Sequence, residues 1–204
     1  MTATTRPSGK DFQNILALVR AAVDAGVSLI QLREKSLTAR TLFELTLRSA
    51  AITRGTNTRL LVNDRADVAV AAAADGVHLT TRSIKADVIR RTFGTDFLIG
   101  VSTHSLMEAR EARDRCADFA VFGPIFATPS KHLYGPPVGI EKLREAAHEV
   151  SPFPLVALGG ITREKAVETL RAGASGVAGI SLFSSVENLS ATVRAIRDAP
   201  IIQT

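Results

Sequence analysis

The sequence predicts an α/β fold in which a parallel sheet closes into a barrel of eight strand–helix units, (βα)8. Short, almost continuously apolar runs alternate with segments of helical periodicity, and each apolar run is followed by such a segment. Strands that are apolar throughout are covered on both faces, which is typical of a parallel sheet beneath helices. An open, doubly wound sheet is the alternative arrangement of the same elements.

The first half of the chain begins with a helix at 12–25. Its apolar residues recur at spacings of three and four: Phe12, Ile15, Leu16, Val19 and Val23. Gly26 then ends this helix. The apolar runs that follow predict strands at 27–32, 59–62, 76–79 and 97–101. The periodic segments between them predict helices at 38–53, 68–74, 84–93 and 105–116.

The second half continues the alternation. Its apolar runs and periodic segments predict strands at 119–122, 155–158 and 176–182 and helices at 140–150, 163–171 and 186–197. Thr162 is placed to cap one of these helices and Gly173 to end it in a left-handed conformation. The loop at 124–138 is longer than the usual connection, which predicts a functional segment.

Seven strand–helix units follow the first helix, so a closed TIM barrel needs one more strand at the start. Residues 2–6 are the candidate, and they are few and polar. The first strand is therefore predicted to be short or degenerate, unless the start of the chain has been lost. The whole chain, 1–204, is predicted to form a single domain in which residues 1–10 are loose.

The composition restricts the function classes. No apolar run approaches the ~20 residues that a membrane helix needs, and the N-terminus has no apolar signal core, so we expect a cytoplasmic protein without a membrane partner. The single cysteine, Cys116, excludes an internal disulfide and a cysteine-based metal cluster. The net charge is +5, but the basic residues are scattered and form no run, which argues against nucleic acid. An anionic small molecule explains the basic excess equally well.

In a parallel barrel, groups that carry chemistry collect at the carboxyl ends of the strands. The residues at these ends are Gln31, Arg33, Lys35, Asn63, Asp64, His78, Ser102, His104, Thr128, Ser130, Lys131, Gly159, Gly160 and Ser181. This set is rich in cations and hydroxyls and poor in carboxylates. It lacks the paired carboxylates of a glycosidase and the nucleophile elbow of a hydrolase. It fits a phosphorylated, anionic ligand.

Several of these residues have a second interpretation. Arg33 and Lys35 alternate along the chain and either point together into the barrel mouth or form a solvated turn. His78 lies inside an apolar strand, where a hydrogen-bonded core histidine is an alternative to a binding role. Asp64 is either a metal ligand or a turn residue. The glycine pair at 159–160 precedes a helix and favours a phosphate site, or it gives clearance for packing.

The chain resembles thiamine phosphate synthase and its relative, the TenI thiazole tautomerase. Seven motifs carry the resemblance, in order and at family spacing: 31–35 (QLREK), 62–64 (VND), 75–79 (DGVHL), 100–104 (GVSTH), 123–131 (GPIFATPSK), 157–161 (ALGGI) and 172–181 (AGASGVAGIS). The resemblance implies a (βα)8 barrel, often a homodimer, that acts on phosphorylated small molecules in thiamine biosynthesis.

The synthase joins hydroxymethylpyrimidine pyrophosphate to a thiazole phosphate and releases pyrophosphate. The resemblance implies that the pyrophosphate is held by Arg33, Lys35, Asn63 and Lys131. The pyrimidine and the leaving group would face Gln31 and Ser102. The thiazole phosphate would be held by Thr128, Ser130, Gly160 and Ser181. The resemblance also implies that Asp64 binds Mg²⁺, and we expect His78 and Gly159 to add substrate contacts.

Two departures from the synthase pattern bear on the reaction. Ser83 stands where the family has a second Mg²⁺-binding aspartate, although the neighbouring Arg82 could bind pyrophosphate directly. The first-strand motif is also missing. Both favour the tautomerase, but Pro124 stands where the tautomerase has its catalytic histidine. Because Lys35, Asp64 and Lys131 are retained, we expect a synthase-like transferase. A tautomerase and a non-catalytic binder of thiazole phosphate or thiamine phosphate are the alternatives.

Overall fold

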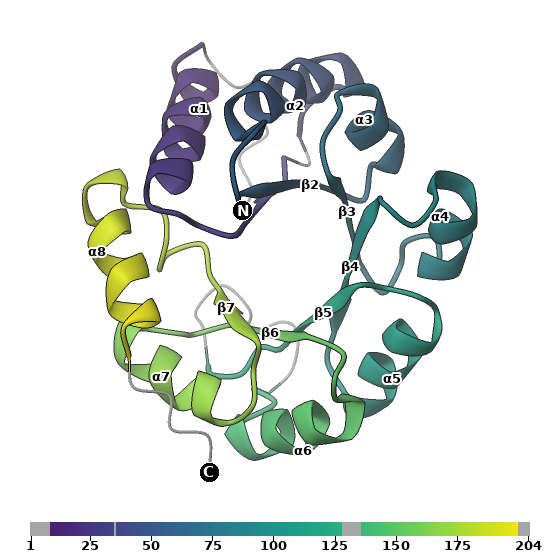
Figure 1. Cartoon of the computed structure of the whole chain (residues 1–204), viewed down its shortest axis with the longest axis vertical. Helices are drawn as coiled ribbons and strands as arrows, with labels where there is room; N and C mark the ends of the chain where they lie inside the picture. Colours follow the sequence, from purple (N-terminus) through teal and green to yellow (C-terminus); the bar gives the residue numbers. More distant parts are fainter. Residues whose placement is uncertain (1–8, 35, 128–135, 200–204) are drawn as a thin grey trace.

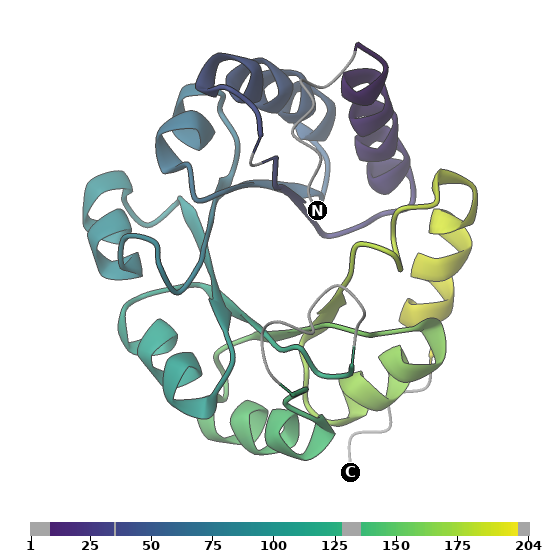
Figure 2. The same cartoon turned by 180° about the vertical axis from the view of Figure 1, so that it is seen from behind.

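The computed structural model describes residues 9–34, 36–127 and 136–199. Seven parallel strands form one sheet in the order β1-β2-β3-β4-β5-β6-β7, and the helices surround the curled sheet (Figures 1 and 2). The strands are β1 (Leu29–Leu32), β2 (Arg59–Asn63), β3 (Gly76–Leu79), β4 (Leu98–Thr103), β5 (Phe119–Phe122), β6 (Leu155–Leu158) and β7 (Gly176–Ala178). The helices are α1 (Gly9–Asp24), α2 (Ala39–Thr53), α3 (Ala66–Ala71), α4 (Ala86–Phe93), α5 (Leu106–Asp114), α6 (Ile140–Val150), α7 (Arg163–Arg171) and α8 (Val186–Arg197).

The predicted α/β barrel is confirmed, since the strands alternate with helices and curl into a ring. The candidate first strand, residues 2–6, lies outside the described residues. Most predicted elements agree with the structure within two residues, but three do not. The helix predicted at 12–25 is α1, which begins three residues earlier, at Gly9. The strand predicted at 176–182 ends at Ala178, because the chain turns and the N–H of Phe183 donates to the carbonyl of Ile180. The helix predicted at 68–74 is α3, which begins and ends earlier.

Polar side chains cap three helices where the sequence predicted helix starts. The hydroxyl of Thr38 accepts the N–H of Thr41 at the start of α2. Ser105 accepts the N–H of Glu108 in α5, and Thr162 accepts the N–H of Lys165 in α7. Each cap satisfies a backbone donor that the first helical turn leaves without a partner.

The outer face of the sheet packs against the helices and forms the main core. Its strand residues are fully or almost fully buried: Val62, Val77, Ile99, Ala120, Phe122, Leu155 and Ala157. Helix residues such as Ala109, Leu143 and Ala166 belong to the same cluster. Since neighbouring side chains of a strand point to opposite faces, the alternate residues face the inside of the ring.

The register brings the polar residues of four strands to the inner face. Asn63 of β2 pairs with His78 of β3, and His78 pairs with Gly100 of β4. Gln31 of β1 pairs with Leu61, two residues before Asn63. Ser102 lies two residues after Gly100 and so has the same orientation. Gln31, Asn63, His78 and Ser102 therefore point into the barrel.

The ring has a seam between β1 and β7, which are the edges of the sheet in the described part of the chain. Helices α1 and α8 close this seam by packing Ala22 against Leu189 and Val193. A guanidinium nitrogen of Arg197 also donates to the carbonyl of Gly26, which precedes β1. The seam is therefore held largely by side chains. Among the described helices, none is both long and apolar enough to cross a bilayer.

Candidate active site

The inner face carries two neutral hydrogen-bonded pairs on four consecutive strands. The amide nitrogen of Gln31 donates to the side-chain oxygen of Asn63 at 3.0 Å. Nε2 of His78 and the hydroxyl oxygen of Ser102 are hydrogen-bonded at 2.9 Å. Both pairs lie near the carboxyl ends of the strands, where the sequence analysis placed the site. The structure thus brings four of the predicted residues together.

His78 is held in a fixed place within the barrel. Its side chain is buried, and its ring centroid lies 6.2 Å from that of Phe119. Gly100 makes room for the imidazole, because a Cβ there would lie 2.8 Å from Nδ1 of His78. Burial lowers the pKa of His78 to about 4, and the positive charge of Arg33 acts in the same direction. The imidazole is therefore neutral near pH 7, which agrees with the alternative of a hydrogen-bonded core histidine.

Charged residues lie around this neutral interior. Arg33 follows β1 directly, is exposed, and is close enough to His78 to affect its pKa. Asp64 follows β2, is exposed, and has a positive φ of 59°, while its N–H donates to the carbonyl of His78 at 2.9 Å. A left-handed conformation is uncommon for a residue with a side chain, although Asp adopts it more readily than most, and Ala73 and Cys116 of this chain share it. The predicted Lys35 lies outside the described residues.

The turn after β3 uses the hydroxyl of Ser83 within the turn itself. This hydroxyl accepts the N–H of Thr80 at 2.7 Å and lies 2.9 Å from the Thr80 hydroxyl. Arg82, between them, donates its own N–H to the Thr80 hydroxyl at 3.3 Å. Ser83, which stands where the resemblance implies a second carboxylate, is therefore a neutral group that already has partners.

The glycine pair after β6 has a packing role that the structure makes explicit. Gly159 and Gly160 have φ values of 105° and 62°. A Cβ on Gly159 would lie 2.5 Å from Cβ of Pro124, and one on Gly160 would lie 2.6 Å from the carbonyl oxygen of Ala127. Both glycines are thus required for the segment after β5 to pack here. A phosphate contact at the same place stays a prediction.

The remaining predicted residues are only partly described. Ser181 is exposed in the turn after β7, whereas Thr128, Ser130 and Lys131 lie outside the described residues. His104 precedes α5, and its N–H donates to the carboxylate of Glu108 at 2.5 Å. Its ring nitrogen also donates to the carbonyl of Gly123. This second contact ties the turn after β4 to the start of the segment after β5, and no local pattern in the sequence indicates it.

The described residues contain few candidate metal ligands. Within 9–34, 36–127 and 136–199, no group of three or more His, Cys, Asp or Glu side chains could hold a metal ion. Asp64 is an exposed carboxylate that forms no ion pair with a described residue. Mg²⁺ commonly takes one or two carboxylates and completes its shell with water and substrate phosphates. Asp64 therefore fits Mg²⁺ that arrives with a phosphorylated substrate.

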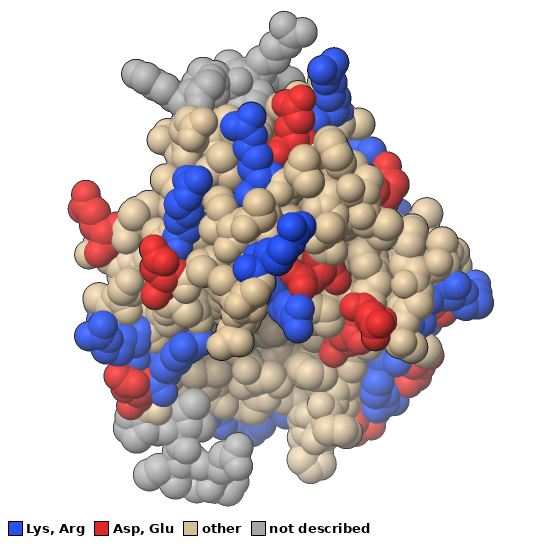
Figure 3. Space-filling view, turned by 45° about the horizontal axis from the view of Figure 1, so that its top comes forward, with Lys and Arg blue, Asp and Glu red and all other residues tan. Residues whose placement is uncertain are grey.

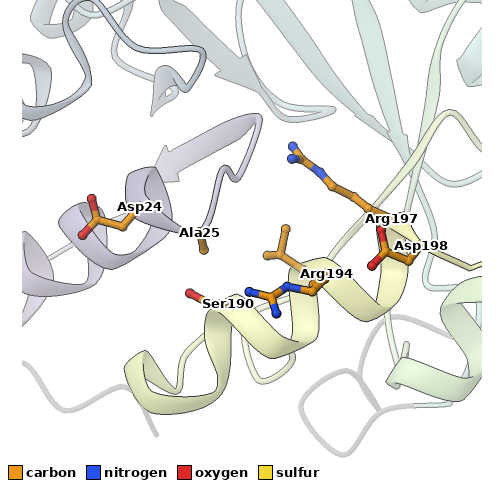
Figure 4. Close-up of a pocket in the computed structure, with 7 residues that line it drawn as sticks. Asp24, Ala25, Ser190, Arg194, Arg197 and Asp198 are labelled. Carbon is orange, nitrogen blue, oxygen red and sulfur yellow. The ribbon is translucent and has the colours of Figure 1, made fainter.

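Two cavities lie near these elements. One, of about 290 Å³, lies between the ends of α1 and α8 and contains none of the predicted site residues (Figure 4); it is lined by Asp24, Ala25, Ser190, Val193, Arg194, Arg197 and Asp198. The other, of about 220 Å³, includes Thr80, Ser83 and Ser102 and extends toward α5. On the face in Figure 3, basic and acidic side chains are interspersed.

Comparison with known proteins identifies the family. The sequence profile of a family described as thiamine monophosphate synthase matches residues 3–183. A thiamine-phosphate synthase of Moorella thermoacetica is 40% identical over 183 residues, which are 90% of this chain and 87% of that protein. One of Roseiflexus sp. (strain RS-1) is 40% identical over 179 residues, 88% of this chain and 75% of that protein.

A solved structure agrees with these sequence matches. The thiamine phosphate pyrophosphorylase of Pyrococcus furiosus superposes with a TM-score of 0.78 and 31% identity, covering 89% of this chain and 87% of that one. The resemblance seen in the seven motifs is confirmed, and the chain belongs to the thiamine monophosphate synthase/TenI family.

Proposed function

We propose that the chain is a thiamine-phosphate synthase, which joins hydroxymethylpyrimidine pyrophosphate to thiazole phosphate and releases pyrophosphate. The observation that carries the proposal is the division of the barrel mouth into a neutral interior and a charged rim. Gln31, Asn63, His78 and Ser102 supply uncharged hydrogen-bonding groups. Arg33 and Asp64 follow the first two strands as charged, exposed groups. This division suits a neutral heterocycle with a pyrophosphate tail.

The Gln31–Asn63 pair supports a pyrimidine in the interior. Because the nitrogen of Gln31 donates to the oxygen of Asn63, Gln31 keeps its oxygen as an acceptor and Asn63 keeps its nitrogen as a donor. An aminopyrimidine has the complementary groups, an exocyclic amine and ring nitrogens. Ser102 adds a hydroxyl on the same face. Gln31 and Ser102 would face the ring, and Asn63, which the resemblance assigns to the pyrophosphate, would donate where the ring meets the pyrophosphate that extends toward Arg33.

The rim would bind the leaving group. Arg33, with Lys35 and Lys131 by family resemblance, would neutralise the charge that develops on pyrophosphate as its bond to the pyrimidine breaks. Asp64 would hold Mg²⁺ together with pyrophosphate oxygens, and the bound ion would supply further charge neutralisation. The thiazole nitrogen then forms the new bond to the pyrimidine carbon.

The thiazole phosphate would lie at the other side of the mouth. Gly160 precedes α7, whose first N–H groups and dipole favour an anion. Ser181 follows β7 and, with Thr128 and Ser130, would add hydroxyl donors. This arrangement places the two substrates on opposite halves of the ring.

One assay tests the proposal directly. The protein is incubated with both substrates and Mg²⁺, and release of pyrophosphate is measured; a parallel reaction contains only the thiazole carboxylate phosphate. We expect pyrophosphate and thiamine phosphate in the first reaction, with a requirement for Mg²⁺. Isomerisation in the second reaction without coupling in the first would establish the tautomerase, which the neutral Ser83 favours. Binding without turnover in either would establish a non-catalytic binder.

A further inference from the structure

His78 and Ser102 differ in how far a bound molecule can reach them. The His78 side chain is only 4% exposed and lies against Phe119 and Gly100. Ser102 is half-buried on the inner face, two residues closer to the carboxyl end of β4 than Gly100, the residue paired with His78. A molecule inside the barrel therefore meets the hydroxyl of Ser102 before it meets the imidazole. His78 can act on such a molecule mainly through Ser102.

The surroundings of His78 do not suit an acid–base role. In a catalytic serine–histidine pair, a carboxylate holds the second ring nitrogen and stabilises the imidazolium. Among the described residues, the hydrogen bond of the His78 ring is the one to Ser102, and the charge that acts on it is the cation of Arg33. A positive charge opposes the imidazolium. The pair is thus suited to orienting the Ser102 hydroxyl and not to acid–base catalysis.

A free serine hydroxyl rotates and can donate in any of several directions. A hydrogen bond to a rigid partner removes this freedom before the substrate arrives, so the substrate binds without the entropic cost of ordering the hydroxyl. The imidazole is such a partner, because Gly100 and Phe119 fix its plane.

We propose that His78 is a positioning residue that fixes the direction of the Ser102 hydroxyl for the pyrimidine substrate. The identity of that substrate rests on the proposed function; the coupling between the two side chains does not. The interaction belongs to the pyrimidine half of the mouth, since both residues lie on β3 and β4, away from Gly160 and Ser181.

A double-mutant cycle tests the proposal. The variants are His78→Phe, Ser102→Ala, both together, and His78→Gln, which keeps a neutral hydrogen-bonding group. Thr103→Val is the matched control, because Thr103 is also a buried hydroxyl of β4 but donates to the carbonyl of Val121 on the outer face. Melting temperatures establish that each variant is folded. For each, kcat and the KM of both substrates are measured.

We expect His78→Phe to lower kcat/KM for the pyrimidine substrate roughly tenfold, the scale of one oriented hydrogen bond. In the Ser102→Ala background the same change should cost less than about twofold, because the residue through which His78 acts is gone. His78→Gln should recover most of the loss, and the KM of thiazole phosphate should stay unchanged. Equal losses in both backgrounds, or a rise in both KM values, would overturn the proposal.

A second measurement needs neither turnover nor a His78 variant. Nitrogen-15 NMR of the imidazole side chain reports which ring nitrogen carries the proton. We expect a single tautomer in the wild type and a changed tautomer ratio in Ser102→Ala, with no change in Thr103→Val. An unchanged ratio in Ser102→Ala would overturn the proposal. If the wild type does not couple the two substrates but the ratio changes, the proposed function fails while the His78–Ser102 coupling stands.

Discussion

The two ends of the barrel use their polar side chains differently. Where the strands begin, charged side chains bind backbone: Arg90 donates to the carbonyls of Gly94 and Phe97 at 2.8 Å and to Asp118 at 2.7 Å. Where the strands end, four side chains of the inner face bind one another, in the Gln31–Asn63 and His78–Ser102 pairs. The contacts at the first end hold the fold together, and the second is the end at which we propose that the substrates bind.

Two aspartates repeat the same device at the first end. Asp75 precedes β3 and accepts the N–H of Leu60 at 2.7 Å, while Asp118 precedes β5 and accepts the N–H of Ile99 at 2.6 Å. Each carboxylate thus ties the start of one strand to its neighbour. The difference between the ends teaches that a charged residue near a strand can be structural or functional according to the end at which it lies.

If Arg90 took part in catalysis, the distinction between a structural and a functional end of the barrel would be wrong. Arg90→Met should lower the free energy of unfolding by about 3 kcal/mol, because it removes donors from several carbonyls and leaves the Asp118 carboxylate without its cation. Its kcat should be unchanged. Urea unfolding measures the first quantity and the coupling assay the second.

Arg91→Met is the matched control for Arg90→Met. Arg91 is exposed and pairs with Asp87 one helical turn earlier at 2.9 Å. Such a surface pair contributes less than about 0.5 kcal/mol. Similar losses in the two variants would contradict a structural role specific to Arg90.

The buried imidazole predicts how stability depends on pH at the functional end. Burial lowers the pKa of His78 from 6.5 to about 4, so between these values the unfolded chain binds a proton that the folded chain does not. Stability should therefore fall as the pH falls through this window, by about 3 kcal/mol for this group. His78→Gln should lack this component. If the free energies of unfolding of the wild type and of His78→Gln fall by the same amount between pH 7 and 4, this prediction is wrong.

The proposed contacts with the thiazole phosphate can be tested by substituting one exposed residue, Ser181, and one partly buried residue, Gly160. Ser181→Val and Gly160→Val should each weaken binding of thiazole phosphate by about 1–3 kcal/mol, the scale of lost hydrogen bonds. Gly160→Val should also lower the melting temperature, because its Cβ meets the carbonyl of Ala127. Ser181 is exposed, so its variant should melt normally. Unchanged calorimetric affinity in Ser181→Val, with a normal melt, would remove Ser181 from the site.

The smallest effect concerns the metal. Mg²⁺ should bind weakly to the empty protein and more tightly with pyrophosphate, because Asp64 is the one carboxylate assigned to it. Ser83→Asp should tighten Mg²⁺ by about 1 kcal/mol, the scale of one added charged ligand near the surface, and raise the rate of coupling. Lys131→Ala should lower the rate of coupling by more than Ser83→Asp raises it, because it removes a cation proposed to bind the leaving group. Calorimetry with and without pyrophosphate measures the affinity; no gain in Ser83→Asp would show that the turn after β3 lies outside the metal site.

The sequence predicted well the helix boundaries that glycines and capping residues mark, because these are local signals. Gly173 has a φ of 97° and Thr162 caps α7, as the pattern indicated. The sequence did not predict which side chains on different strands are hydrogen-bonded to each other. Gln31 and Asn63 are 32 residues apart, and their contact depends on the register of β1 and β2. The same holds for Asp75, whose carboxylate accepts the N–H of Leu60, 15 residues earlier in the chain.

The seam between β1 and β7 gives the ring an uneven response to temperature. Around the rest of the described sheet, neighbouring strands are joined by backbone hydrogen bonds, whereas the contacts that described residues make across the seam are the apolar packing of Ala22 with Leu189 and Val193 and the bond from Arg197 to the carbonyl of Gly26. Apolar contacts weaken on cooling. The barrel should therefore loosen first at this seam in the cold, and amide protons of β1 and β7 should then exchange with solvent faster than those of β4.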